Sequence, residues 1–586
     1  MQQGDSPGTS SSGNTILAND HLNPLMQNAI VDAEDASLQE NAMETPPESS
    51  QEQGSNTDNS ITDVTSTTEQ DQVPDLKDDT ADNSFDISDS ASSKSAQQTE
   101  ALLCDGMSAV AVETPTSSEV DNKLQVQAPQ ESASIISTDF SQASISANLG
   151  DKNAQVALGD MYKDGKGVQQ DYKAAMEWYL RAAEQGDAVG LRKVGVLYHY
   201  GHGVTQDDST ALTWYLKSAD KRNAKAQSNI GYCYCYGQGV PLDYSKAMAW
   251  FLAAAGQGNT TACVHIGNMY NDGVGVPQDY SQALDWYNKA AEQDDRHAQY
   301  YLGCMHLYGE GMAQSFSKAM EWLIKSAEQG HADAQANVGY LYRDGKGATQ
   351  DYSKARKWFI KAAEQGDADA QNHIGKMYND GLGVPQDCSQ AFDWFSKAAV
   401  QGDQYAQYNL GCLYRGGKGV GQSFSKAMEW FIKSAEQGHA DAQANVGYLY
   451  RGGKGATRDY SKAREWFVKA AEQGNAYSQH NLGCLYNCGQ GVEQDYVQAM
   501  AWYPKAADQN YMNAQYSIGR MYKNGHGVPV DYSQASVWLL KAAKQGHDEA
   551  QYAVGGLYEY GDGVVSGGSQ AMALVRTEAP RLFAPI

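Results

Sequence analysis

Eleven tryptophans divide most of this chain into segments of equal length. Each tryptophan stands 36 residues after the one before it, and they occupy positions Trp178, Trp214, Trp250, Trp286, Trp322, Trp358, Trp394, Trp430, Trp466, Trp502 and Trp538. A glycine series with the same step runs from Gly159 to Gly555 and has twelve members. A fixed period in this range is typical of a solenoid, in which one supersecondary unit is stacked many times.

Each unit is expected to contain two helices, and residues 368–378 show the first of them most clearly. Ala370, Ile374 and Met377 are spaced by four and three residues, which places them on one helical face. Gly375 lies inside this helix, where glycine costs up to about 1 kcal/mol relative to alanine. Its recurrence in every unit predicts that the partner helix approaches closely at this point.

The second helix of each unit is expected to begin at an N-cap aspartate such as Asp171. Trp178 and Tyr179 then fall on its buried side, and the sequence favours the indole as the large anchor of the unit. A one-residue turn at Gly186 ends the helix, and most units repeat that glycine. The exceptions at this position are Arg222, Asp294 and Asn510.

A longer period is superimposed on the first. Residues 315–322 recur unchanged at 423–430, which is three units further on. This spacing indicates that a three-unit block, roughly 276–383, was duplicated into 384–491. Arrays grow in this way because each unit contacts only its neighbours.

Two units depart from the pattern. Pro504 lies two residues after Trp502, inside the second helix, where proline removes a hydrogen bond and predicts a kink. The last unit has Leu574 where tryptophan is due. Residues 567–586 are therefore expected to form a degenerate C-terminal cap.

The acidity of the chain is confined to residues 1–140. This segment holds 26 Asp and Glu against 3 Lys and Arg, a net charge of −23, so only −4 of the total of −27 remains for the rest. It has no Trp or Tyr and is expected to stay disordered, because it cannot bury enough apolar surface. We therefore expect a tail at 1–140, a solenoid at 141–566 and the cap at 567–586.

Charge, hydropathy and cysteine content limit where the protein is located and what class of partner it binds. No basic stripe is visible that would bind nucleic acid. The N-terminus lacks the pattern of a signal peptide, no apolar run is long enough to span a bilayer, and no prenylation motif is present. Nine irregularly placed cysteines fit packed, reduced thiols. A cytoplasmic monomer without membrane insertion is the expectation.

The repeated motif resembles the Sel1-like repeat, a relative of the tetratricopeptide repeat. The resemblance rests on Ala-x-x-Trp-Tyr/Phe-x-Lys-Ala-Ala-Glu-Gln-Gly, on Ala-Gln-x-x-Leu/Ile-Gly-x-Met/Leu-Tyr and on Gly-x-Gly-Val, over about residues 150–566. It implies an all-α, right-handed α/α solenoid of about 11–12 units and a protein-binding adaptor that assembles signalling or membrane-associated complexes. Fungal relatives are linked to chitin synthase regulation, and a fungal-type member is expected.

Two other function classes remain open, a secreted effector that engages a host protein and a hydrolase with a site in the groove. We do not expect an enzyme, a cofactor or a metal site, because no nucleotide loop, paired zinc ligands or catalytic grouping stands out. The positions three before and one after the helix glycine vary between units, which suggests a concave binding face formed by the first helices. The candidate residues are Tyr232, Tyr300, Tyr340, Tyr408, Tyr448, Tyr516 and Tyr552.

Overall fold

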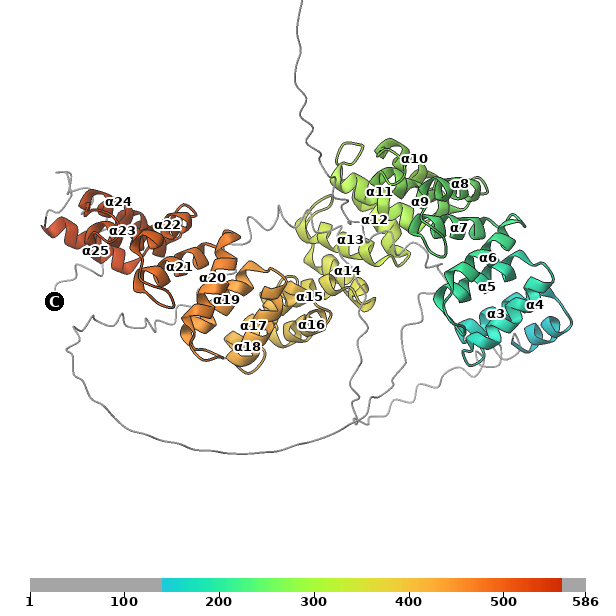
Figure 1. Ribbon diagram of the computed structural model, residues 1–586, viewed down its shortest axis with the longest axis horizontal. Helices are drawn as coiled ribbons and strands as arrows, with labels where there is room; N and C mark the ends of the chain where they lie inside the picture. Colours follow the sequence, from blue (N-terminus) through green and yellow to red (C-terminus); the bar gives the residue numbers. More distant parts are fainter. Residues whose placement is uncertain (1–139, 561–586) are drawn as a thin grey trace, which may run out of the picture. The chain divides into compact units, whose positions relative to one another are not determined.

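The computed structural model describes residues 140–560, and within this range all regular structure is helical (Figure 1). First and second helices alternate along the chain. The first helices are α3 (Lys152–Asp164), α5 (Ala188–Tyr200), α7 (Ala224–Tyr236), α9 (Thr260–Asp272), α11 (Arg296–Tyr308), α13 (Ala332–Asp344), α15 (Ala368–Asp380), α17 (Gln404–Gly416), α19 (Ala440–Gly452), α21 (Ala476–Cys488), α23 (Met512–Asn524) and α25 (Asp548–Tyr560). Each helix packs mainly against the next in chain order, as expected of a solenoid.

The second helices are slightly more varied in length, with 12 or 13 residues. They are α4 (Tyr172–Glu184), α6 (Asp208–Ala219), α8 (Tyr244–Ala255), α10 (Tyr280–Ala291), α12 (Phe316–Glu328), α14 (Tyr352–Glu364), α16 (Cys388–Val400), α18 (Phe424–Glu436), α20 (Tyr460–Glu472), α22 (Tyr496–Ala507) and α24 (Tyr532–Lys544). The predicted all-α solenoid with a regular two-helix unit is confirmed.

Within the described residues, the array begins with half a unit. Residues 140–148 are helical, and the turn after them has Gly150 at φ 93°, in the place that Gly186 takes one unit later. Ala147 is buried, and its carbonyl accepts a hydrogen bond of 3.1 Å from Gln155 Nε2. This helix therefore occupies the position of a second helix ahead of the first full unit. The predictions for residues 1–139 and for the cap at 567–586 lie outside the described residues.

The recurrent helix glycine faces a buried side chain of its own unit. A Cβ atom built on Gly339 would lie 2.6 Å from Cε1 of Phe359, and the aromatic ring of Phe359 is fully buried. The predicted close approach is confirmed. The predicted anchor is wrong, since Trp358 is only half-buried and the residue after it fills the space beneath the glycine.

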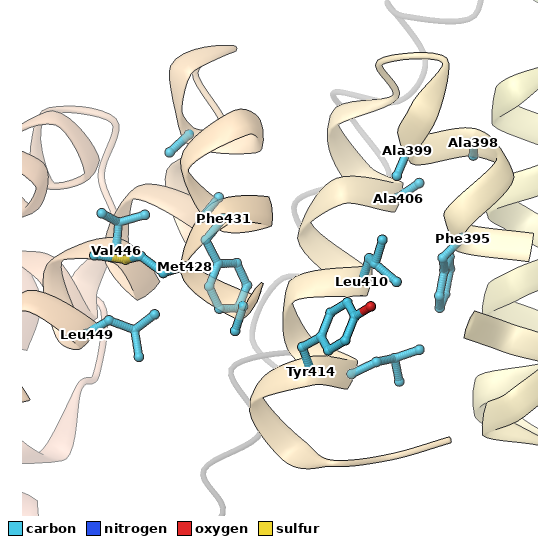
Figure 2. Packing of buried hydrophobic residues seen from close by; sticks show 14 of the residues in the cluster. Phe395, Ala398, Ala399, Ala406, Leu410, Tyr414, Met428, Phe431, Val446 and Leu449 are labelled. Atoms are coloured by element: carbon cyan, nitrogen blue, oxygen red, sulfur yellow. The ribbon is translucent and has the colours of Figure 1, made fainter. Parts of the chain in front are cut away.

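Figure 2 shows how this packing continues from unit to unit. Phe395 from α16, Leu410 from α17, Phe431 from α18 and Leu449 from α19 belong to one buried cluster. The tryptophans pack at the edges of such clusters, as Trp466 of the following unit does here. Trp466 of α20 therefore bridges its own unit and the one before it.

Glutamine side chains form a polar seam between units. Gln335 Nε2 donates to the carbonyl of Ala327 in the preceding unit at 3.0 Å, and Gln335 Oε1 accepts from Gln365 Nε2 at 2.8 Å. Most units repeat this arrangement, but Leu191 and Cys263 take the place of the first glutamine in two of them. The seam adds a second hydrogen bond to carbonyl groups at the end of a second helix, such as that of Ala327, which also accepts from the backbone N–H of Gly330 at 3.1 Å.

Arg222→Gly is expected to stabilise the array by about 0.5–1 kcal/mol. Arg222 has φ 62°, a conformation that costs a residue with a Cβ about 1–2 kcal/mol, whereas glycine adopts it freely but loses more entropy on folding. Asp294→Gly is the control, because Asp294 has φ 64° but its Oδ1 accepts a hydrogen bond of 2.7 Å from Gln299. The melting temperature should rise for Arg222→Gly and should not rise for Asp294→Gly. A lower melting temperature for Arg222→Gly would contradict this account.

Pro504→Leu is expected to slow local amide exchange. Pro504 lies inside α22, which continues to Ala507, so one helical hydrogen bond is missing from the third turn. Other units have Leu, Ile, Val, Asn or Ser at this position. Exchange measured by mass spectrometry should slow in residues 495–525 and stay unchanged in residues 300–400. Unchanged exchange in both regions would mean that the proline does not weaken α22.

Candidate protein-binding face

The predicted binding residues lie in two rows on the first helices. The minus-three row comprises the residues three before each helix glycine, and the plus-one row comprises the residues one after it. We call the surface of the first helices that these two rows and the residues flanking them define the first-helix face. The structure brings neighbouring first helices together along these rows, and several of the tyrosines contact a side chain of the next unit.

Three tyrosines of the minus-three row stack on histidines of the following unit. The ring centroids of Tyr300 and His331 are 4.5 Å apart with an interplanar angle of 15°. Tyr408 and His439 repeat this stacking at 4.7 Å, and Tyr516 and His547 are 4.3 Å apart with a tilt of 31°. Successive pairs are three units apart, so the three-unit period extends beyond the block found in the sequence. These rings hold units together.

Three of the predicted residues are buried, two of them in the plus-one row. Tyr232 and Tyr340 are only 6% and 7% exposed, and Tyr300 of the other row is 5% exposed. The Tyr340 hydroxyl donates to Asp369 of the next unit, and its ring packs edge-on against His373 at 4.9 Å. The argument that variable residues imply an open surface is therefore wrong at these three positions. Variation is tolerated because the facing residue of the next unit varies too.

Several tyrosines keep accessible surface on the first helices, among them Tyr200 of α5, which is 39% exposed. Tyr552 is 74% exposed and Tyr448 is half-buried, with its hydroxyl 3.1 Å from Lys454 Nζ. Tyr405 is 41% exposed and was missed, because it lies three residues before the expected minus-three position. Of the predicted seven, Tyr448 and Tyr552 are the best placed to contact a partner.

Carboxylates accompany Tyr405 in the middle of the array. The Asp369 side chain keeps 50% of its surface exposed, and the protein around it raises the pKa of its carboxyl group. Burial also raises the pKa of Asp367 to about 6 and that of Asp403 to about 7, and repulsion from Asp369 adds to both shifts. Asp367 and Asp403 accept hydrogen bonds from backbone N–H groups of the helices that they cap, and Asp369 accepts one from the Tyr340 hydroxyl. All three carboxylates offer further acceptor capacity to a donor.

Hydrogen bonds between units fix the polar side chains of this face. Arg451 Nη1 donates to Asn481 Oδ1 of the next unit at 2.6 Å, and Asn475 Nδ2 donates to Asp441 Oδ1 at 2.9 Å. Nearer the N-terminus, Lys193 Nζ pairs with Asp160 at 2.8 Å. The face is therefore preorganised, which lowers the entropy that a partner must remove on binding.

The second helices present a different surface. Ten of the eleven tryptophans have a lysine or arginine three residues later, with the cation 3.7–4.3 Å from the ring centroid. Trp250 is the exception, because Ala253 stands at that position. Such cation–π pairs cover the indoles and leave little aromatic surface for a partner.

The described part of the chain shows neither a metal site nor a membrane span. Between residues 140 and 560, no group of three His, Cys, Asp or Glu side chains is arranged to hold a metal ion. None of the helices in that range is both long and apolar enough to cross a bilayer. The arrangement on the first-helix face is one of aromatic rings, amides and carboxylates, which suits recognition of another polypeptide.

Comparison with known proteins agrees with the helical geometry. The Sel1 repeat model matches twelve consecutive segments, which are 152–187, 188–223, 224–259, 260–295, 296–331, 332–367, 368–403, 404–439, 440–475, 476–511, 513–547 and 548–574. No curated protein sequence matched the chain. Among solved structures, a protective antigen from uropathogenic Escherichia coli with an SLR fold is 36% identical, with a TM-score of 0.62 over 75% of this chain and 94% of that protein.

A Sel1 repeat protein from Oxalobacter formigenes is 35% identical over 53% of this chain and 90% of its own length, with a TM-score of 0.41. Both of these relatives are bacterial, and the fungal-type assignment stays a prediction. The family match covers the helix pairs described above, including their glycines and N-caps. The chain therefore belongs to the Sel1 repeat family.

Proposed function

We propose that this protein is a scaffold that binds another protein through the first-helix face and so assembles a signalling or membrane-associated complex. The observation that carries the proposal is the unbroken Sel1 array, whose first helices leave Tyr405 and Tyr552 accessible. Repeat arrays bind partners along extended surfaces. Exposed tyrosine suits this role because it offers a large amphipathic contact at low entropic cost.

Polar groups on the same helices support this role. Arg520 and Lys376 are exposed at plus-one positions, and the side chain of Asp369 is half-exposed. Binding energy at protein interfaces is concentrated in a few residues, with Tyr and Arg over-represented. We propose binding without catalysis, in the cytoplasm, where the buried thiols of Cys233 and Cys263 would stay reduced.

A second candidate is an effector that engages a host protein outside the cell. The similarity to a protective antigen of Escherichia coli favours it, since antigens are presented to a host. Fractionation of the source cells separates the two candidates. Recovery in the cytoplasmic fraction supports the scaffold, and recovery in the medium supports the effector.

Affinity purification tests the scaffold directly. The full chain would be the bait, beside a Tyr405→Ala/Tyr552→Ala variant of the first helices. A Leu252→Ala/Val537→Ala variant of the second helices is the control, because Leu252 and Val537 are 45% and 48% exposed. Proteins that are lost with the first variant and kept with the second support the proposal. Loss with only the control variant would assign binding to the second helices.

A further inference from the structure

Three histidines serve as helix N-caps in this array. The backbone N–H of Ala334 donates to His331 Nδ1 at 3.4 Å, that of Ala442 to His439 Nδ1 at 3.2 Å and that of Ala550 to His547 Nδ1 at 3.3 Å. Asparagine takes the same position in other units and caps in the same way, as Asn223, Asn259 and Asn475 do. The histidine caps are therefore not required by the fold.

A histidine can cap a helix only while it is neutral. Nδ1 accepts a hydrogen bond through its lone pair, which protonation removes. A protonated ring would also point an N–H at the N–H of the helix, at the end where the helix dipole disfavours positive charge. The His331 and His547 side chains are each only 10% exposed, so water cannot fully solvate the cation.

The neighbouring charges do not remove this cost. His331 is approached by His297 and Arg296 of α11, which disfavour its charged form, and by Asp333 of α13 at 4.0 Å. His439 faces the uncharged rings of Tyr405 and Tyr408 on α17.

His547 has more acidic neighbours, with Glu549 at 3.0 Å and Asp548 close by on α25. Its other neighbours are His480 of α21 and the Tyr516 ring of α23. The acidic pair favours the charged form of this histidine. His547 should therefore respond least.

We propose that the His331 and His439 caps, and more weakly the His547 cap, are acid-sensitive joints, which loosen three boundaries between units, each three units from the next, when the pH falls below about 6.5. The inference stands on the cap geometry and holds whether or not the first-helix face binds a partner. Loosening would release the stacked Tyr300 and Tyr408 rings at two of these boundaries.

The direction follows from linkage. Burial lowers the pKa of all three histidines, to about 4 for His439, from the ordinary value of 6.5. Their contribution to stability is therefore complete above pH 6.5 and is lost as the pH falls towards the folded-state value. For each unit by which the pH falls within that window, the equilibrium constant for forming such a cap decreases by up to about tenfold.

Aspartate caps should respond in the opposite direction and provide a control within the chain. Asp367 and Asp403 cap α15 and α17, and their pKa values are raised to about 6 and about 7. A raised carboxyl pKa means that the folded state binds the proton more tightly. As the pH falls from 7.5 to 5.5, the unit boundaries at Asp367 and Asp403 should therefore become more stable.

Hydrogen exchange of the full chain tests the proposal. Protection factors, corrected for the intrinsic pH dependence of exchange, would be measured at pH 7.5 and 5.5 in residues 332–341 and 440–449. Residues 476–485, which follow the Asn475 cap, are the reference. We expect protection to fall about tenfold more after the histidine caps than after Asn475, and least of all after Asp367 and Asp403.

His331→Asn should remove the extra fall at its own boundary and leave the one at His439 unchanged. The reciprocal change Asn475→His should create a new acid-sensitive boundary in residues 476–485. The proposal is overturned if histidine-capped and asparagine-capped helices lose protection equally. It is also overturned if His331→Asn keeps the extra fall.

Discussion

Replacing Gly339 by alanine should destabilise the array around α13 and α14 by about 1–3 kcal/mol. The added Cβ would lie 2.6 Å from Phe359 Cε1 and 2.7 Å from Cδ1, and the ring is fully enclosed, so it cannot move aside without disturbing its neighbours. Overpacking of this kind typically has that cost. Long arrays need not unfold in one step, so local hydrogen exchange in residues 332–364 should accompany thermal melting.

Gly452→Ala is the matched control, because Gly452 is also helical. The nearest atom to its added Cβ is Cγ of Lys454 at 3.7 Å, which is an ordinary contact. Alanine is the better helix former, so this change should be neutral or should stabilise α19 by up to about 1 kcal/mol. Equal effects of the two substitutions would show that the helix glycines are not required for close packing.

Tyr340→Ala should cost far more stability than Tyr448→Ala, although the two tyrosines occupy equivalent positions three units apart. Tyr340 is 7% exposed, packs against Phe359 and His373, and donates to Asp369. Truncation of a buried aromatic side chain typically costs about 3–5 kcal/mol. Tyr448 is half-buried, and its truncation should cost about 1 kcal/mol.

Tyr340→Phe separates packing from hydrogen bonding in this comparison. It keeps the ring and removes only the bond to Asp369, whose half-exposed carboxylate can then bind water. A loss of about 0.5–1.5 kcal/mol is expected. If the Tyr340→Ala and Tyr448→Ala variants have the same melting temperature, contacts with the next unit do not determine how much each tyrosine of the plus-one row contributes to stability.

The sequence predicted the architecture closely because its 36-residue period corresponds directly to the two-helix unit of the fold. Gly375 and its equivalents indicated a close helix contact, and in the structure a Cβ on Gly375 would lie only 2.6 Å from Cδ1 of Phe395. The unusual turn residues Arg222, Asp294 and Asn510 were also recognisable, and all three have positive φ. Local chemistry and spacing alone determine these features.

Contacts between units were harder to predict. The periodicity of one helix identifies its apolar face but not which residue of the next unit stands opposite each side chain. The burial of Tyr340 depends on Asp369 and His373, which both belong to the next unit. The same limit explains the wrong anchor. Phe359 is buried, whereas Trp358 is only half-buried and packs against a cluster that includes residues of the preceding unit.

The segment at residues 140–148 was placed almost entirely within the predicted solenoid, but it was not predicted to form a second helix. It has no tryptophan, and only Gly150 and Ala147 keep the pattern of a second helix. The signal that could have found it is the spacing of Gly150, which stands one full repeat before Gly186. The repeat period alone was sufficient to identify this half unit, although its composition differs from that of the other second helices.

A binding titration tests the central claim, that the first-helix face recognises a protein. A partner recovered by affinity purification would be titrated with the wild-type chain, with Tyr405→Ala/Tyr552→Ala and with the control Leu252→Ala/Val537→Ala. The two tyrosines are 41% and 74% exposed, so the folded structure should persist in the variant. We predict that affinity falls about tenfold or more for the tyrosine variant and is unchanged for the control. Wild-type affinity in a folded tyrosine variant would contradict the claim.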